Sequence, residues 1–396
     1  MPSMASTLRL QPLLAAIGYL FLGTADAQCS AGEPCHHMPI IHSTNEKILS
    51  KRAVEVQLTN RTDIAYYTAL NIGTPAQQVY VQLDTGSFEL WVNPTCSTLS
   101  ASDKAFCDAT GSYNKSLSST ATSLKSGKKL AYGLGETNIT YVEDSIALPG
   151  ASEAMTQVQF GVSDSSSDEF AGILGIGYGK GYTTTYPNFV DQLALQNQTS
   201  VKAFSVGLGS KTEQEGAIVF GGVDTSKFAG KLETLDIVPA ADSPDGVPRY
   251  WVSMNNMSLT PPSGVTKTYA NTSIDVFFDT GATLTLLPAA VANAIGEDFG
   301  AAEADASGYY NVDCSLASID GTVNFEFGGL TVKVPYNEFI RTTRSGSTTT
   351  CVLGITASDS FTLLGDTFLR SAYGEFLSSS FRLTLVLVPS NTKTVH

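Results

Sequence analysis

Histidine is scarce in this sequence, and it lies only near the two ends. The 396 residues include four histidines, namely His36, His37, His42 and His396. A body without imidazole excludes Ser-His-Asp and Cys-His catalysis, because both need histidine to carry a proton. It also excludes the zinc helix that carries a His-x-x-x-His pair. Any hydrolytic chemistry must then use carboxylates, which also work in acid, where imidazole would be protonated.

Basic residues and tryptophan are scarce as well. The chain has 23 Lys and Arg against 37 Asp and Glu, a net charge of −14, so we expect no nucleic-acid partner, which would need a basic stripe. The sequence has no Cys-x-x-Cys spacing, which would be the sign of a metal site. We therefore expect no metal and no cofactor. Beyond the N-terminal segment, no apolar run reaches the ~20 residues of a membrane span. The polar C-terminus also lacks the apolar tail of a lipid-anchor signal.

The N-terminus has the features of two processing segments. Residues 1–27 resemble a secretory signal, with Arg9, an apolar stretch over residues 13–22 and a cleavage site at Ala27. A short membrane anchor is the alternative. A dibasic pair, Lys51-Arg52, then predicts a propeptide over residues 28–52, unless the pair is an incidental surface feature. Removing residues 1–52 takes away four basic and three acidic residues, which leaves a body near −15. We therefore predict a secreted zymogen.

Six cysteines in a secreted chain predict disulfides. Four of them lie in the body, and Cys96 with Cys107 and Cys314 with Cys351 are the nearest pairs, one pair after each of two Asp-Thr-Gly triplets. Four cysteines allow three connectivities, so proximity favours this pairing without proving it. The chain also has glycosylation sequons, which predict surface positions, at Asn60, Asn114, Asn138, Asn197, Asn256 and Asn271.

The pattern along the chain is that of an all-β protein. Short runs rich in Val, Ile, Thr, Tyr and Phe alternate with Gly, Ser and Asn clusters, and the clearest predicted strands are residues 65–70, 79–83, 203–208, 217–220 and 323–327. Helical periodicity is rare. We predict two short helices, over residues 189–196 and 289–295, the second opened by Pro288.

The triplet Asp-Thr-Gly occurs twice, beginning at Asp84 and Asp279, each time after an apolar run. An apolar-apolar-Gly element follows each triplet, with its glycine 91 residues after Asp84 at Gly175 and 86 residues after Asp279 at Gly365. Similar spacing of two unlike motifs indicates duplication. We predict an N-terminal lobe over residues 53–240 and a C-terminal lobe over residues 241–396, with one triplet from each facing a cleft.

These motifs resemble those of the pepsin-like aspartic proteases, particularly the secreted fungal members. The similarity covers most of residues 60–390 and is carried by residues 67–77, 84–87, 90–92, 132–135, 218–224 and 364–370. The resemblance implies a bilobal fold of two β-barrel-like lobes with a substrate cleft between them. It also implies endopeptidase activity at acidic pH, in which Asp84 and Asp279 share one proton and activate a water molecule.

The resemblance assigns roles to further residues. Tyr132, Gly133 and Leu134 would form a flap over the substrate, with the Tyr132 hydroxyl near Trp91, although both aromatics could be ordinary core residues. Ser87 would donate to Asp84. The remaining expected site residues comprise a substrate-facing group and two supporting threonines, namely Gly86, Gly281, Ala282 and Thr283, and Thr85 with Thr280. Asp366 is interpreted as a structural residue near the lobe interface.

The sequence departs from the family pattern in three places. Ala282 follows the second triplet where Ser or Thr is common. Without that hydroxyl donor, we expect higher pKa values for the pair formed by Asp84 and Asp279, and therefore activity at less acidic pH. Phe88 and Glu89 follow the first triplet in place of smaller polar residues, which predicts a change either in the apolar packing around the two aspartates or in the nearby substrate subsites. The propeptide is short, which favours activation by a separate dibasic-specific protease.

Three functions fit these features. The preferred one is a monomeric secreted endopeptidase that cleaves proteins and peptides, favours apolar residues around the scissile bond and is inhibited by statine-type compounds. A peptide-binding protein that does not cut would be marked by loss of an aspartate, and both are present. A glycosidase could use paired carboxylates, but the only tryptophans, Trp91 and Trp251, make no sugar-binding cluster.

Overall fold

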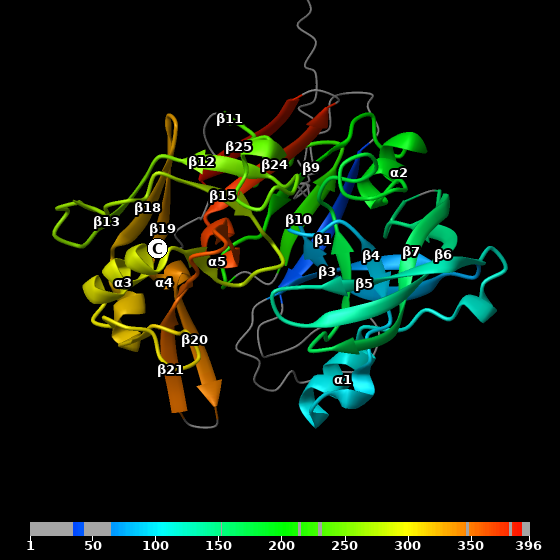
Figure 1. Ribbon diagram of the computed structural model, residues 1–396, viewed down its shortest axis with the longest axis horizontal. Coiled ribbons are helices and arrows are strands. Elements are labelled where there is room, and N and C mark those ends of the chain that lie inside the picture. Colours follow the sequence, from blue (N-terminus) through cyan, green and yellow to red (C-terminus); the bar gives the residue numbers. More distant parts are fainter. Residues whose placement is uncertain are drawn as a thin grey trace, which may run out of the picture.

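Strands are the predominant regular structure of the described residues, and they form one large sheet and three small ones (Figure 1). The computed structural model describes residues 35–42, 65–151, 153–212, 215–228, 232–345, 348–379 and 382–389. The signal segment, its cleavage site at Ala27, the dibasic cleavage site at Arg52 and the sequon at Asn60 lie outside these residues. None of the described helices is long and apolar enough to cross a membrane.

The large sheet contains 13 strands and includes both ends of the described chain. Its order is β11-β25-β24-β9-β10-β1-β2-β3-β8-β4-β7-β6-β5. The bounds are β1 His36–His42, β2 Tyr66–Ile72, β3 Gln77–Asp84, β4 Leu90–Val92, β5 Thr122–Ala131, β6 Glu136–Ala147, β7 Met155–Ser167, β8 Gly172–Gly175, β9 Ala203–Gly207, β10 Glu215–Phe220, β11 Glu233–Asp236, β24 Ala372–Ser379 and β25 Arg382–Pro389. The five strands predicted from the sequence correspond to β2, β3, β9 and β10 of this sheet and to β18, Thr322–Phe327, of a small sheet.

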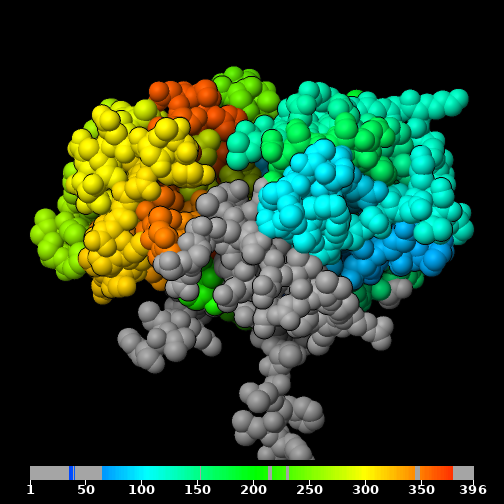
Figure 2. Space-filling view, turned by 90° about the horizontal axis from the view of Figure 1, so that it is seen from below, coloured from blue at the N-terminus to red at the C-terminus, as the bar shows by residue number. Residues whose placement is uncertain are grey.

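The small sheets lie in the C-terminal half. One has the order β12-β15-β23-β16-β22, another β14-β13-β18-β19 and the last β17-β21-β20. Their bounds are β12 Trp251–Met254, β13 Asn256–Thr260, β14 Lys267–Thr268, β15 Ile274–Phe278, β16 Thr285–Leu287, β17 Asn311–Val312, β18 Thr322–Phe327, β19 Leu330–Pro335, β20 Ile340–Ser345, β21 Thr348–Leu353, β22 Ile355–Ala357 and β23 Leu363–Leu364. Seen from below, the yellow and orange C-terminal half lies opposite the cyan and green N-terminal half (Figure 2).

The internal repeat predicted from motif spacing is present as repeated strand pairing. In the N-terminal half, β3 pairs in parallel with β8, with Asp84 opposite Gly175, and β4 runs antiparallel to β8. In the C-terminal half, β15 pairs in parallel with β23, and β16 runs antiparallel to β23. Each Asp-Thr-Gly triplet therefore follows a strand that is supported by the apolar-apolar-Gly element of its own half.

Helices are few and short, as predicted. The two predicted helices are α2, Phe189–Leu195, and α3, Ala289–Asp298. Three others were not predicted, namely α1 Ala101–Ala109, α4 Tyr336–Phe339 and α5 Asp366–Leu369. Helix α1 is amphipathic and buries only Phe106 and Cys107, so its apolar periodicity is weak in the sequence.

The disulfides have the connectivity that proximity favoured. Cys96 is bonded to Cys107, and Cys314 is bonded to Cys351. The first bond joins the turn before α1 to the helix itself. The second joins the short helical turn at residues 314–318 to β21. Each disulfide therefore closes a loop within its own half of the repeat.

The N-terminal segment contains a strand that was not among those predicted from the sequence. Within the expected propeptide, residues 28–52, His36–His42 forms β1, which pairs with β10 along six positions and with the start of β2. Met38 and Ile40 are fully buried on one face of the strand. Two buried residues in a short segment rich in histidine give too weak an alternation for the sequence to predict a strand.

Candidate functional site

The two Asp-Thr-Gly triplets meet at the junction of the halves through a reciprocal set of hydrogen bonds. The Thr85 backbone N donates to the Thr280 hydroxyl at 3.1 Å, and the Thr280 backbone N donates to the Thr85 hydroxyl at 3.0 Å. Each hydroxyl in turn donates to a carbonyl of the opposite half, at Phe278 for Thr85 and at Leu83 for Thr280. Both threonines are 1% exposed, so these bonds hold the triplets together without competition from water.

The glycines of the triplets let each loop close over the opposite aspartate. A Cβ atom on Gly86 would lie 2.7 Å from the carboxyl atoms of Asp279, and one on Gly281 would lie 2.6 Å from Asp84 Oδ1. No side chain fits at such distances, so only glycine permits this approach. The two carboxyl groups that the sequence placed in equivalent positions are therefore neighbours.

Asp84 lies among hydrogen-bond donors. Its Oδ1 accepts from the backbone N atoms of Gly86 and Ser87, at 2.8 and 3.1 Å, and its Oδ2 accepts from the Ser87 hydroxyl at 2.5 Å. On the other side, Asp279 Oδ1 accepts from the Gly281 backbone N at 2.8 Å. Ala282 occupies the position equivalent to Ser87 and has no hydroxyl to donate. The pair is therefore asymmetric, although the backbone around it is nearly symmetric.

Burial raises the pKa of Asp279 well above its ordinary value, and the neighbouring charge of Asp84 raises it further. The backbone N of Gly281 and the positive charge of Arg249 act in the opposite direction. Beneath this pair, burial also raises the pKa of Asp366, whose backbone N donates to the Ala282 carbonyl at 2.8 Å. Asp366 is fully buried, which places it under the second triplet and away from solvent.

The hairpin of β5 and β6 carries the residues expected to form a flap. Trp91 Nε1 donates to the Tyr132 hydroxyl at 2.7 Å, and burial, followed by the charge of Asp84, raises the pKa of Tyr132 well above its ordinary range. Leu134 at the tip is 80% exposed. Gly135 has φ +88°, a conformation that glycine adopts without strain.

Behind this hairpin lies a polar cluster that the sequence did not predict. Glu89 is 4% exposed, and its Oε2 accepts from the hydroxyls of Tyr141 and Tyr186, at 2.5 and 2.9 Å. Its Oε1 accepts from Lys128 Nζ on β5 at 2.5 Å. Glu89 therefore connects the segment after the first triplet to both strands of the hairpin. In the sequence, the only indication of such a role was that Glu89 departs from the family pattern.

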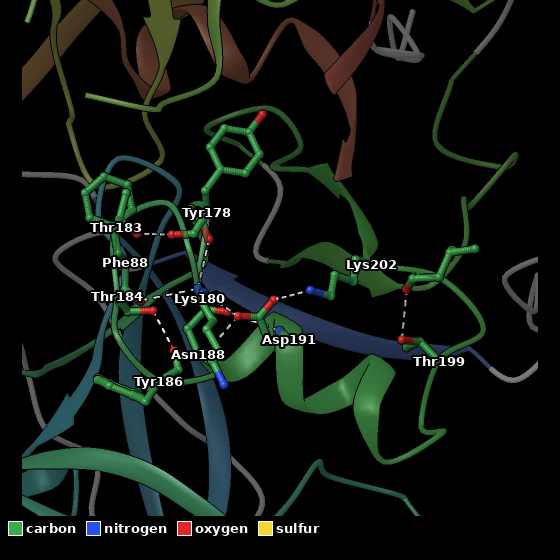
Figure 3. Close-up of polar contacts among 12 residues, drawn as sticks. Phe88, Tyr178, Lys180, Thr183, Thr184, Tyr186, Asn188, Asp191, Thr199 and Lys202 are labelled. Carbon is green, nitrogen blue, oxygen red and sulfur yellow. Dashed lines mark hydrogen bonds and ion pairs between the residues drawn. The ribbon is translucent and has the colours of Figure 1, made fainter. Parts of the chain in front are cut away.

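Helix α2 holds the same segment from another side. The Asn188 side chain caps the helix, donates to the Gly177 carbonyl at 2.9 Å and approaches the Phe88 carbonyl at 3.4 Å. Asp191 completes the capping box and forms an ion pair with Lys202 at 2.6 Å (Figure 3). The loop that follows Asp84 is thus supported by a built polar framework rather than left mobile.

The remaining expected site residues and the described sequons differ in exposure. Gly281, Ala282 and Thr283 are partly exposed, and Gly133 is exposed on the hairpin tip. The sequon residues at Asn114, Asn138, Asn197 and Asn271 are exposed, whereas Asn256 is partly buried and accepts from the Thr272 hydroxyl.

Comparison with known proteins agrees with this geometry. A family model described as eukaryotic aspartyl protease matches residues 65–386. Candidapepsin-3 of Candida albicans is 34% identical over 344 residues, covering 84% of this chain and 81% of its own. The acid protease of Saccharomycopsis fibuligera is 32% identical over 342 residues, covering 83% and 82%.

Two further relatives extend the comparison to a longer protein and to a solved fold. A protein of Aspergillus oryzae named probable aspartic-type endopeptidase opsB is 33% identical over 360 residues, covering 86% of this chain and 71% of its own. The crystal structure of an aspartic proteinase from Irpex lacteus superimposes with a TM-score of 0.66, covers 91% of this chain and 99% of its own, and is 22% identical. The chain therefore has the all-β bilobal pepsin fold, belongs to the eukaryotic aspartyl protease family and is an aspartic-type endopeptidase.

Proposed function

We propose that this chain is a secreted endopeptidase that hydrolyses proteins and peptides at acidic pH through a water molecule activated jointly by Asp84 and Asp279. The observation that carries the proposal is that the carboxyl groups of Asp84 and Asp279 are neighbours, held there by the reciprocal hydrogen bonds between Thr85 and Thr280. Two carboxyls this close cannot both ionise, so the pair shares one proton, which is the established behaviour of aspartic proteases.

The hydrogen bonds around the pair suggest how the proton is shared. Donors from Gly86 and Ser87 stabilise a negative charge on Asp84, whereas the raised pKa of Asp279 keeps the proton on that carboxyl. Asp84 then takes a proton from the attacking water, whose oxygen bonds to the scissile carbonyl carbon. Asp279 donates to the developing oxyanion. Collapse of this tetrahedral intermediate breaks the C–N bond, the leaving nitrogen takes the proton held by Asp84, and the products are a carboxylic acid and an amine.

Substrate preference follows from the hairpin tip. Leu134 is 80% exposed on the flap that would close over the substrate, where an apolar side chain favours apolar residues around the scissile bond over Lys or Arg. We expect Leu134→Asp to increase cleavage next to Lys and Arg in a mixed peptide library. An unchanged cleavage profile would contradict this preference.

The proposal extends to how the protein is made. The N-terminal features support removal of residues 1–27 as a signal and residues 28–52 as a propeptide, which leaves lobes of residues 53–240 and 241–396. A relative from Candida albicans bears the name secreted aspartic protease 3, which supports an extracellular location. We further propose that the mature enzyme is a monomer and that the exposed sequons carry glycans.

The decisive experiment is proteolysis of a denatured protein from about pH 3 to pH 7 by the wild type, Asp84→Asn and Asp279→Asn, with and without a statine-type inhibitor. Loss of either carboxyl should reduce the rate by about 10³-fold or more, because the water loses its base or its acid. Asp108→Asn, which changes an exposed aspartate on α1, is the matched control and should retain full activity. Peptide binding without cleavage by the wild type would instead identify a binding protein.

A further inference from the structure

Arg249 lies just before β12, and its guanidinium group reaches across to the first catalytic loop. Its Nε donates to Asp245 Oδ2 at 2.7 Å, and its Nη1 donates to the carbonyl of Gly86. The backbone N of the same glycine donates to Asp84 Oδ1. Arg249 therefore holds the Gly86–Ser87 peptide unit, whose own N–H at Ser87 also donates to Asp84 Oδ1 at 3.1 Å. The arginine side chain is only 17% exposed.

The support of Arg249 is itself rigid. Asp245 accepts from the backbone N of Val247 at 2.9 Å and from Trp251 Nε1 at 3.2 Å, in addition to the arginine. The Tyr250 hydroxyl donates to the Ile176 carbonyl in the other half at 3.1 Å. Hydrogen bonds therefore hold the chain on both sides of Arg249, at Asp245 before it and at Tyr250 after it. The guanidinium is pre-organised rather than a flexible surface charge.

Three aromatic rings from both halves surround the guanidinium. Its carbon lies 5.2 Å from the ring centres of Phe88 and Phe277 and 5.5 Å from that of Phe361. Phe88 belongs to the loop after Asp84. Phe277 lies on β15, two residues before Asp279, which follows the end of that strand. These distances are in the range of cation–π contacts, so the arginine bridges the loops that carry the two carboxyls.

This arrangement connects two departures that appeared unrelated in the sequence. Phe88 supplies one of the three rings. Ala282, which lacks the expected hydroxyl, packs against the apolar cluster that contains Trp251 and Phe277. Phe88 and Ala282, the two departures from the family pattern, therefore both lie in the immediate surroundings of Arg249. The carbonyl of Gly281, the counterpart of Gly86, accepts instead from the neutral side chain of Gln82 at 3.1 Å, so only the first loop is held by a cation.

We propose that Arg249 is a positioning residue that clamps the first catalytic loop to the aromatic rings beside the second, and that its positive charge partly compensates the carboxyl pair for the hydroxyl donor that Ala282 lacks. The proposal rests on the shared-proton mechanism above. Among the described residues, the titratable and charged groups near the pair or the arginine include Asp84, Asp279, Asp245, Asp366 and Tyr132. Among these groups, Arg249 acts on Asp279 by lowering its pKa, against the effects of burial and of Asp84.

The test compares Arg249→Met, which keeps the length but loses the charge and the donors, with Arg249→Lys, which keeps the charge. Lys267→Gln, which removes an exposed cation far from the site, is the matched control. For each variant, kcat and KM are measured with a fluorogenic peptide across the pH profile. Thermal unfolding and titration of active sites with a statine-type inhibitor report the folded fraction.

For Arg249→Met we expect kcat to fall about tenfold with KM changed less than about threefold, because the lost contact positions reacting groups. Both limbs of the profile should move to higher pH by about half a unit or more, since a cation no longer favours the ionised pair. Arg249→Lys should restore the limbs and only part of kcat. Phe88→Ser should lower kcat in the wild type and add little to Arg249→Met, because the two residues act together.

Unchanged limbs and a kcat within twofold of the wild type in Arg249→Met would overturn the proposal. Equal losses in the Met and Lys variants with unchanged limbs would overturn it too, since they indicate packing alone. If the Met variant does not fold, Arg249→Lys and Phe88→Ser decide in its place: full activity in both overturns the clamp, and lowered kcat in folded enzyme supports it. Cleavage by Asp84→Asn or Asp279→Asn would instead refute the shared-proton mechanism itself.

Discussion

Replacing Glu89 by alanine tests how strongly the flap hairpin is anchored behind the active site. The change leaves the hydroxyls of Tyr141 and Tyr186 without their acceptor, and each unsatisfied buried hydroxyl costs about 1–3 kcal/mol. Lys128 is about half exposed, so its ion pair adds at most about 1 kcal/mol. We therefore expect Glu89→Ala to lower the free energy of unfolding by about 3–5 kcal/mol.

The functional effect should follow from the loosened hairpin. Because β5 and β6 carry Tyr132 and Leu134, we expect kcat/KM for a peptide to fall about tenfold in Glu89→Ala. Burial, together with Glu89, raises the pKa of both Tyr141 and Tyr186, so the two hydroxyls remain protonated donors wherever the enzyme is active. The loss should therefore be the same across the acidic range.

Urea unfolding and peptide hydrolysis of matched variants measure these effects. Glu89→Gln keeps the volume and one acceptor oxygen, so it should cost less than Glu89→Ala. Glu136→Ala is the control, because this exposed glutamate pairs with Lys129 on the same hairpin and should cost less than about 1 kcal/mol. A Glu89→Ala cost below about 1 kcal/mol, or equal costs for Glu89→Gln and Glu89→Ala, would refute the anchoring role.

Three further predictions concern the acid pair and the disulfides. Ala282→Thr should add a hydroxyl donor to the ionised pair and move activity to stronger acid; an unaltered pH-rate profile argues against this. The pKa of Asp279 is raised on folding, so stability from this group is present below its unfolded pKa and is lost as pH rises through the folded pKa. Asp279→Asn should therefore raise Tm at pH 7 more than at pH 3, and an equal change at both pH values contradicts the sign. Changing Cys314 and Cys351 to serine opens a loop with a separation of 37 residues and should cost about 4 kcal/mol in urea unfolding, a value that a loss under about 1 kcal/mol would exclude.

Local features of the sequence were sufficient for much of the fold. The β-rich pattern, the helices at residues 189–196 and 289–295 and the pairing of the four body cysteines could all be predicted, because each depends on periodicity or on short separation. The two Asp-Thr-Gly triplets could also be identified as counterparts. Their equal local contexts come from strand endings that the sequence itself encodes.

Tertiary structure alone decided how these elements act together. Thr85 and Thr280 are 195 residues apart, yet the backbone N of each donates to the hydroxyl of the other. No spacing rule predicts which distant hydroxyl will accept from a buried backbone N–H. From the sequence, Glu89 was only a departure from the family pattern, and Arg249 was not singled out, because a charged side chain gains its role from the burial and the aromatic rings around it. Sequence determined which groups could carry the chemistry, whereas long-range packing determined which side chains hold them, since such contacts leave no periodic signal in the chain.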